Sequence, residues 1–261
     1  MQASDIAELF SVEGKIALVT GGTAGIGRMM AEALVVAGAK VWLVARNADD
    51  CARVGEELNA KGDCRAIPGD LSTMAGIQGV AGAFGRAEAR IDILINNAGV
   101  FAAEPIDEFP EDLWDASLDL NLKAAFFLTQ KLLPHLRQGA RRGDRARVIN
   151  IGSGHGIRTA VFESYAYQAS KAGLHHLTKV MAQRLAAEGI NVNAIAPGVF
   201  PSRLTAPFSE ATIAAIVGRI PVGRYGDERD IAAAALYLSS RASAFVTAIV
   251  LPVDGGFSGI G

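Results

Sequence analysis

Short apolar runs alternate with longer helical patterns along the whole chain, and this alternation restricts the fold more than any other feature. Runs such as Lys15–Thr20 (KIALVT) and Lys40–Ala45 (KVWLVA) are apolar nearly throughout, which indicates strands that are buried on both faces. Further strands are expected at Cys64–Pro68, Ile91–Ile95, Arg147–Gly152, Asn191–Ala196 and Ile249–Pro252. Helices are expected at Gly25–Ala37, Ala48–Lys61, Ser72–Gly85, Glu111–Arg137, Tyr167–Glu188 and Glu228–Ser239. The pattern predicts an α/β fold in which a doubly wound parallel sheet of about seven strands carries helices on both faces.

A single domain, residues 1–261, accounts for this pattern, because the chain length suits one large α/β domain and no linker interrupts the alternation. Residues 1–12 precede the first strand and are interpreted as an N-terminal extension. The segment from about residue 198 to residue 226 breaks the regular alternation and contains three prolines. We predict that it forms a substrate loop or lid.

Charge and composition exclude several classes of partner. The formal net charge is -2, which gives no electrostatic basis for binding nucleic acid or an anionic membrane. No window approaches the roughly 18 continuous apolar residues of a membrane span, and the N-terminus lacks the pattern of a signal peptide. Cys51 and Cys64 form no CxxC pair, so we interpret them as reduced structural cysteines. A cytoplasmic protein is expected, and no metal site is predicted.

A glycine-rich turn, Thr20–Gly27 (TGGTAGIG), lies directly between the first strand and the first helix. Glycines allow the backbone to approach a pyrophosphate closely, and the start of a helix favours negative charge. The spacing is G-x3-G-x-G rather than the commoner G-x-G-x-x-G. A simple tight connection is the alternative interpretation, but the position favours the dinucleotide site of a Rossmann fold.

The end of the second strand bears on the choice of dinucleotide. Enzymes that use NAD usually place a carboxylate there to bind the ribose 2′-hydroxyl. This chain instead reads Val44-Ala45-Arg46-Asn47, and Arg46 can pair with a 2′-phosphate. We therefore predict a preference for NADP(H), with NAD(H) as the alternative and a solvent-exposed arginine without a ligand as a third interpretation.

Tyr167 and Lys171 are four residues apart in a predicted helix, so both side chains can enter one cleft. A nearby ammonium stabilises phenolate, and we therefore expect the pKa of Tyr167 to be lowered. This would suit Tyr167 to general acid catalysis at a developing alkoxide. Such a pair also occurs by chance on exposed helix faces. Tyr165 is six residues from Lys171 and is interpreted as a packing residue.

Ser153 lies just beyond the carboxyl end of a predicted buried strand, where ligand sites of open α/β sheets are found. Its hydroxyl could hold a substrate oxygen, although a serine among glycines can also simply form a turn. His155 raises the alternative of a serine hydrolase. No G-x-S-x-G motif surrounds Ser153, however, and that function would leave the glycine-rich turn without a role.

In this order and spacing, the motifs resemble those of the short-chain dehydrogenase/reductase family. The resemblance extends from about Glu13 to Gly256 and rests on the Thr20–Gly27 turn, Asn96-Asn97-Ala98-Gly99, Asn121, Ser153, the Tyr167–Lys171 pair, Pro197-Gly198 and Asp254-Gly255-Gly256. It implies an oxidoreductase that interconverts a ketone and a secondary alcohol by hydride transfer, with NAD(P) supplying or accepting the hydride.

The same resemblance implies a catalytic tetrad of Asn121, Ser153, Tyr167 and Lys171. Ser153 would hold the carbonyl, Tyr167 would donate the proton, Lys171 would bind the nicotinamide ribose, and Asn121 would anchor a water that links Lys171 to solvent. With the glycine-rich turn and Arg46, the implied cofactor-binding residues are Gly21, Thr23, Ala24, Gly25, Ile26, Gly27, Arg46, Asp70, Leu71, Asn97, Ala98, Gly99, Tyr167, Lys171, Pro197, Gly198, Phe200 and Ser202. The chain departs from the family pattern at Ser202, where a threonine is common, and at Ala24, where many NADPH-dependent members carry a basic residue.

Within the family, the segments Gly62–Ser72, Ala146–Ser153 and Ala196–Thr205 are most similar to β-ketoacyl reductases of the rhamnolipid-associated type. This similarity implies that a 3-oxoacyl thioester is reduced to the 3-hydroxyacyl product. Gluconate-type, sugar-alcohol and steroid dehydrogenases share the scaffold and remain alternatives. A non-catalytic NAD(P)-binding regulator is an alternative of another class, although such a protein would be expected to lack Tyr167 or Lys171.

Assembly and further partners are expected from the same resemblance. The helices that contain Asn121 and Tyr167 usually pack against their copies, which implies a homotetramer or a dimer. A basic loop, Arg137–Arg147, contains five arginines and one aspartate. It could contact an acyl carrier protein or a coenzyme A phosphate, but a solvated loop is the simpler interpretation.

Overall fold

The computed structural model describes residues 2–141, 143–160, 162–201 and 210–259. Seven parallel strands form one sheet in the order β3-β2-β1-β4-β5-β6-β7. Their bounds are β1 Ile16–Thr20, β2 Lys40–Ala45, β3 Cys64–Pro68, β4 Ile93–Asn96, β5 Ala146–Ile151, β6 Ile190–Pro197 and β7 Val250–Val253. The predicted fold class is confirmed. The strand order reverses between β1 and β4, and ligands of open α/β sheets bind at such a switch point.

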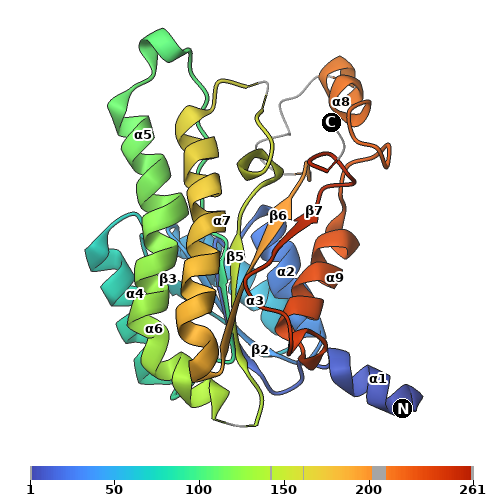
Figure 1. Cartoon of the computed structure of the whole chain (residues 1–261). Coiled ribbons are helices and arrows are strands. Elements are labelled where there is room, and N and C mark those ends of the chain that lie inside the picture. Colours follow the sequence, from blue (N-terminus) through green and yellow to red (C-terminus); the bar gives the residue numbers. More distant parts are fainter. Residues whose placement is uncertain (1, 142, 161, 202–209, 260–261) are drawn as a thin grey trace.

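Helices cover both faces of this sheet, as Figure 1 shows. Their bounds are α1 Ala3–Phe10, α2 Gly25–Val36, α3 Ala48–Asn59, α4 Met74–Ala87, α5 Glu111–Leu118, α6 Ala124–Ala140, α7 Tyr165–Leu185, α8 Glu210–Val217 and α9 Glu228–Ser239. The buried side chains of α2, α3 and α9 form one hydrophobic core against the sheet, and those of α4, α6 and α7 form the other. Among the described residues, no helix combines the length and apolar character needed to cross a membrane.

Local sequence signals explain where several helices begin. The side chain of Asn47 accepts the backbone N–H of Asp50 at the start of α3, and Thr73 accepts the N–H of Gly76 at the start of α4. Asp227 caps α9 in the same way. Each cap satisfies a backbone donor that a helix leaves without a partner in its first turn.

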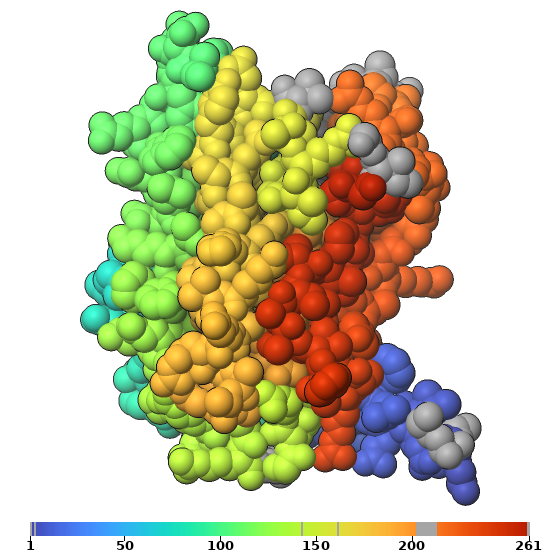
Figure 2. Space-filling model, in the orientation of Figure 1, coloured from blue at the N-terminus to red at the C-terminus, as the bar shows by residue number. Residues whose placement is uncertain are grey.

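Three elements differ from the predicted pattern. Residues 3–10 of the N-terminal extension form the helix α1, which projects from the lower edge of the molecule (Figures 1 and 2). The predicted loop 198–226 contains the short helix α8. The helix predicted over 111–137 is interrupted by a π-helical turn, Asp119–Lys123, which separates α5 from α6. A π-helical turn inserts one residue into the helix, which changes the direction of its side chains and is frequent at functional sites.

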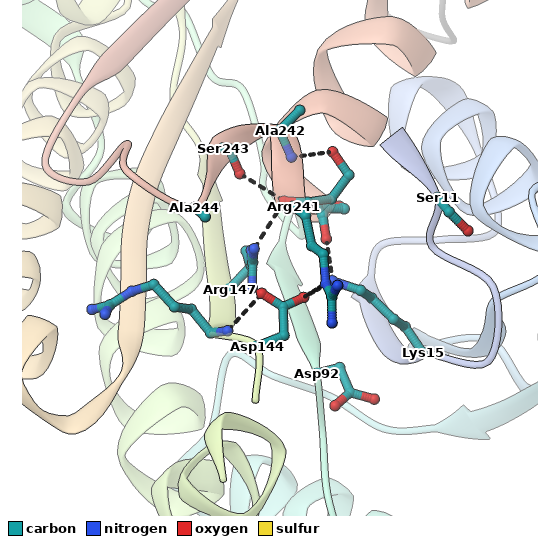
Figure 3. Close-up of polar contacts among 12 residues, drawn as sticks. Ser11, Lys15, Asp92, Asp144, Arg147, Arg241, Ala242, Ser243 and Ala244 are labelled. Atoms are coloured by element: carbon teal, nitrogen blue, oxygen red, sulfur yellow. Dashed lines mark hydrogen bonds and ion pairs between the residues drawn. The ribbon is translucent and has the colours of Figure 1, made fainter. Parts of the chain in front are cut away.

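Arg147 is an unusual member of the buried strand β5, because its side chain is fully buried. Its guanidinium forms an ion pair with Asp144 at 2.9 Å and donates to the carbonyl of Ser240 at 2.9 Å. Asp144 also pairs with Lys15 at 2.7 Å, and Arg241 lies 3.9 Å away (Figure 3). We call Lys15, Asp144, Arg147 and Arg241 the Asp144 cluster. It lies at the amino end of β5 and joins segments that are distant in the sequence.

Candidate active site

The glycine-rich turn connects β1 to α2 at the switch point of the sheet. The amide of Asn97 donates to the carbonyls of Thr20 (2.8 Å) and Gly21 (3.2 Å), and Thr20 Oγ1 accepts the N–H groups of Asn97 and Ala98. These bonds hold the turn against the segment after β4. Ala24, which precedes α2, makes no side-chain cap bond. The N–H groups at the start of α2 can therefore bind a phosphate, as a dinucleotide requires.

Gly27 leaves no space for a side chain, because a Cβ atom there would lie 2.3 Å from both Asn97 Nδ2 and the carbonyl oxygen of Gly21. We expect Gly27→Ala to lower the free energy of unfolding by about 1–3 kcal/mol, since the turn must shift to accept the methyl group. Urea denaturation measures the change. Gly79→Ala in α4 is the control, because a Cβ there meets nothing within 4 Å. This variant should be as stable as the wild-type protein or more so, and equal stability of both variants would contradict the prediction.

Arg46 and Asp70 lie at the carboxyl ends of the neighbouring strands β2 and β3. The Arg46 side chain is exposed. Hydrogen bonds from the backbone and the hydroxyl of Ser72 lower the pKa of Asp70, and the positive charge of Arg46 contributes to the shift. Leu71 is buried beside them. The structure thus brings together the residues predicted to surround the adenine end of a dinucleotide.

Asn121 is held rigidly inside the π-helical turn. Its Oδ1 atom accepts the N–H of Val100 at 2.8 Å, and its amide donates to the Val100 carbonyl and to Ser170 Oγ, both at 3.0 Å. A Cβ on Gly99 would meet Asn121 Oδ1 at 2.9 Å and Lys171 Nζ at 3.5 Å. The predicted residues Asn121, Gly99 and Lys171 are therefore neighbours. Ser170, which the sequence analysis did not single out, connects Asn121 to α7.

Tyr167 and Ser153 form a hydrogen bond through their side chains. Lys171 follows one turn after Tyr167 on α7, is almost fully buried, and donates from Nζ to the carbonyl of Ile151 at 2.8 Å. Its ammonium lies 5.7 Å from the centre of the Tyr167 ring. The serine, tyrosine and lysine predicted from the sequence thus lie together at the carboxyl end of β5.

The pKa of Tyr167 differs from the prediction. Burial raises this pKa, and the hydrogen bond from Ser153 lowers it by less. Burial also lowers the pKa of Lys171 to about 8. The expected lowering of the Tyr167 pKa was therefore wrong. The Lys171 ammonium donates to the Ile151 carbonyl and not to the phenol, so the loss of water around the phenol has the larger effect. A high pKa keeps the phenol protonated, which is the state that a proton donor needs.

The arrangement around Ser153 does not support a serine hydrolase. His155 contacts Ser153 Oγ through its backbone N–H, at 3.1 Å, and not through its imidazole. The imidazole of His155 instead makes an edge contact with the ring of Phe257, with the ring centres 5.8 Å apart. The two side chains therefore do not form the pair of nucleophile and base that such an enzyme requires.

At the carboxyl end of the neighbouring strand β6, Pro197 is followed by Gly198. A Cβ on Gly198 would lie 2.7 Å from the Cα atom of Asp254, so the two segments approach closely. The ring of Phe200 is 5% exposed and lies in the core, against Gly226. Ser202, the last predicted cofactor-binding residue, lies outside the described residues, as does part of the predicted lid.

These features together are those of a dinucleotide-dependent oxidoreductase, and comparison with known proteins agrees. The model of the short chain dehydrogenase family matches residues 15–212. The chain belongs to the short chain dehydrogenase family. As a short chain dehydrogenase, it is an oxidoreductase that acts on CH–OH donors with NAD(P) as the acceptor.

Individual relatives of this short chain dehydrogenase are similar over almost their whole length. The rhamnolipids biosynthesis 3-oxoacyl-[acyl-carrier-protein] reductase of Pseudomonas aeruginosa is 46% identical over 250 residues, which cover 95% of this chain and 98% of the relative. The P. aeruginosa RhlG/NADP active-site complex has a TM-score of 0.94 and 46% identity, covering 96% and 99% of the two chains. A gluconate 5-dehydrogenase from Burkholderia cenocepacia, in complex with NADP and tartrate, has a TM-score of 0.91 and 30% identity, covering 98% and 100%.

Proposed function

We propose that this short chain dehydrogenase reduces 3-oxoacyl thioesters to 3-hydroxyacyl thioesters with NADPH. The observation that carries the proposal is the aromatic lining beside the tyrosine. The ring of Phe101 packs edge-on against Tyr167, with the ring centres 5.1 Å apart. His155 and Phe257 extend the aromatic surface from the Ser153 side. An acyl chain fits such surroundings better than a polyol, because it loses no hydrogen bonds to water there.

Four of the described residues have distinct roles in this reduction. When bound, NADPH supplies the hydride to the carbonyl carbon. Ser153 holds the carbonyl oxygen, and Tyr167 transfers its phenolic proton to that oxygen as the C–O double bond becomes a C–O single bond. Lys171 binds the nicotinamide ribose and neutralises the phenolate, and Asn121 anchors a water through which Lys171 regains contact with solvent.

The loop between Ser153 and Tyr167 supports the same class of substrate. Ile157 and Phe162 in this loop are large apolar residues with 46% and 47% of their surfaces exposed. The relative from P. aeruginosa at 46% identity is named as a 3-oxoacyl reductase. An exposed apolar surface next to a few polar side chains is typical of a ligand-binding site.

A gluconate-type dehydrogenase is the second candidate function. Arg158 follows Ile157, and its guanidinium lies 5.6 Å from the centre of the Phe257 ring. An arginine at this position could pair with the carboxylate of a sugar acid. The similar structure with a TM-score of 0.91 is named as a gluconate 5-dehydrogenase, which also supports this second candidate.

A comparison of two substrates distinguishes these functions. The enzyme is incubated with NADPH and either acetoacetyl-CoA or 5-ketogluconate, and the absorbance of NADPH is followed. Our proposal requires kcat/KM for acetoacetyl-CoA to exceed that for the sugar acid at least tenfold. The reverse ratio would assign the gluconate-type function, and no turnover with a wider panel of ketones would favour a non-catalytic binding protein.

The preference for NADPH depends on Arg46 in this proposal. Arg46→Gln should weaken NADPH binding about 10- to 100-fold, because a charge-assisted hydrogen bond to the 2′-phosphate is lost. Binding of NADH should stay within twofold, which fluorescence titration measures for both cofactors. Arg65→Gln is the control, since Arg65 is an exposed arginine of the neighbouring strand β3. An equal loss for NADPH and NADH would contradict the assigned role of Arg46.

We further propose a homotetramer, or a dimer, in the cytoplasm. Large apolar side chains on α5, α6 and α7 have more than a third of their surfaces exposed, namely Trp114 (40%), Phe126 (36%) and Val180 (49%). Packing against a second copy would bury them. The cytoplasmic location is supported by Cys51 and Cys64, which are free and buried. Burial raises the pKa of Cys64 to about 11, so this thiol is unreactive.

A further inference from the structure

The segment that carries Ser153 lies directly on α7, and two glycines permit the contact. A Cβ on Gly152 would lie 1.9 Å from Nε2 of His175, and a Cβ on Gly156 would lie 2.8 Å from its Cε1 atom. The imidazole of His175 therefore occupies the space that these glycines leave open. Its side chain is 6% exposed and follows Lys171 by one turn of α7.

The contacts of His175 are polar as well as steric. The backbone N–H of Ser153 donates to Nε2 of His175 at 3.4 Å. A second hydrogen bond joins the imidazole to the backbone of Gly156. One side chain thus contacts both ends of the Ser153–Gly156 segment and ties it to the helix that carries Tyr167 and Lys171.

The protonation state of His175 suits it to accept a hydrogen bond. Burial lowers the pKa of His175 to about 4, and the positive charges of Lys171 and Lys179 contribute to the shift. The imidazole is therefore neutral near pH 7, and a neutral imidazole has one nitrogen with a free lone pair. That lone pair can accept the Ser153 N–H only when the proton is on the other nitrogen, which agrees with a second bond to the Gly156 backbone.

We propose that His175 is a positioning residue whose Nε2 acceptor fixes the backbone of Ser153 and so places the serine hydroxyl beside Tyr167. The inference rests on the role that the proposed function gives to Ser153. An apolar side chain of similar volume would fill the same space as His175 but would leave the buried N–H of Ser153 without a hydrogen-bond acceptor. A misplacement of about 1 Å at a reacting group can cost about 100-fold in rate.

Three substitutions of His175 distinguish the effect of its hydrogen-bond acceptor from the effect of its side-chain volume. H175L keeps a similar bulk and removes the acceptor. H175Q can place Oε1 near the position of Nε2, whereas the shorter side chain in H175N cannot reach it. H176Q is the control, since His176 is the neighbouring residue and is exposed. For each variant we would measure kcat with any ketone that the enzyme reduces, and Kd for NADPH by fluorescence titration.

We expect kcat of H175L to fall about 10- to 100-fold with Kd for NADPH within twofold, and H175Q to recover most of the loss. H175N should resemble H175L, and H176Q should resemble the wild type. The inference is overturned if H175L keeps kcat within threefold, if H175Q is as impaired as H175L, or if NADPH binding weakens in parallel. Should H175L fail to fold, equal kcat values for H175Q and H175N would overturn it.

The proposed function and this inference can fail separately. If acetoacetyl-CoA is not reduced, any other ketone substrate still tests His175. If the wild type reduces no ketone, the proposed function fails, and hydrogen exchange at the Ser153 amide then decides. Exchange should be at least tenfold faster in H175N than in H175Q, and equal rates would overturn the inference.

Discussion

Tyr167→Phe is expected to lower kcat about 1,000-fold while Kd for NADPH stays within twofold. The phenylalanine keeps the edge contact with Phe101 but has no proton for the carbonyl oxygen, and general acid catalysis contributes about 100- to 10,000-fold. Single-turnover reduction of acetoacetyl-CoA measures the chemical step, and fluorescence titration measures NADPH binding.

The neighbouring tyrosine provides a matched control for this experiment. Tyr165 lies on the same helix, and its hydroxyl donates to the exposed carboxylate of Glu163 at 2.6 Å. Tyr165→Phe should therefore change kcat by less than threefold. If Tyr167→Phe kept more than a tenth of the wild-type kcat, another group would have to supply the proton.

Asp144→Asn is expected to lower the free energy of unfolding by about 3–5 kcal/mol, because it removes the negative partner of a buried and charged Arg147. The Arg147 side chain is fully buried, and Asp144 pairs with it at 2.9 Å. Urea denaturation of the wild type and the variant measures the difference. The control is Asp119→Asn, which breaks an exposed pair with Lys123 and should cost less than about 1 kcal/mol. Equal losses in both variants would contradict the role of the Asp144 cluster.

The acid stability of the protein should show the same cluster. Burial alone would raise the pKa of Asp144, but hydrogen bonds from Lys15 and Arg147 lower it to about 2, from 3.8. A carboxyl whose pKa is lower in the folded than in the unfolded protein adds stability above pH 4 and loses it as the pH falls toward 2. The wild type should therefore lose most of its stability advantage over Asp144→Asn between pH 4 and pH 2. An advantage that is as large at pH 2 as at pH 4 would contradict this assignment.

The strands were predictable because most are short, mainly apolar runs between helical patterns. All seven runs named in the sequence analysis form strands, with shifts of at most two residues. The helix α1 was not predicted, and its residues Ile6 and Phe10 are each 49% exposed, so the helix has little contact with the core. The π-helical turn was also missed, because the hydrophobic period of a helix does not show a single inserted residue.

The chemistry of the site was only partly predictable. Residue types and spacing indicated Ser153, Tyr167 and Lys171, and the structure brings them together. The predicted direction of the Tyr167 pKa shift was wrong. Sequence spacing indicates how close two charged groups can lie, but it does not show how far burial removes water from them. His175 could not be recognised from the sequence. Its relation to Lys171 is an ordinary helical spacing, and its contact with Ser153 depends on how the segment after β5 folds back.

The two ends of strand β5 carry groups with different roles, one in the stability of the fold and the other in catalysis. Arg147 near its amino end belongs to the Asp144 cluster. Ser153 lies just beyond its carboxyl end, six residues after Arg147, which is about 20 Å in an extended chain. Substitutions at sites so far apart usually have additive effects. Substitutions in the Asp144 cluster should change how much folded enzyme a cell contains. Substitutions around Ser153 should change which substrates the enzyme converts. Thermal tolerance and substrate range can therefore evolve, or be engineered, independently in this enzyme.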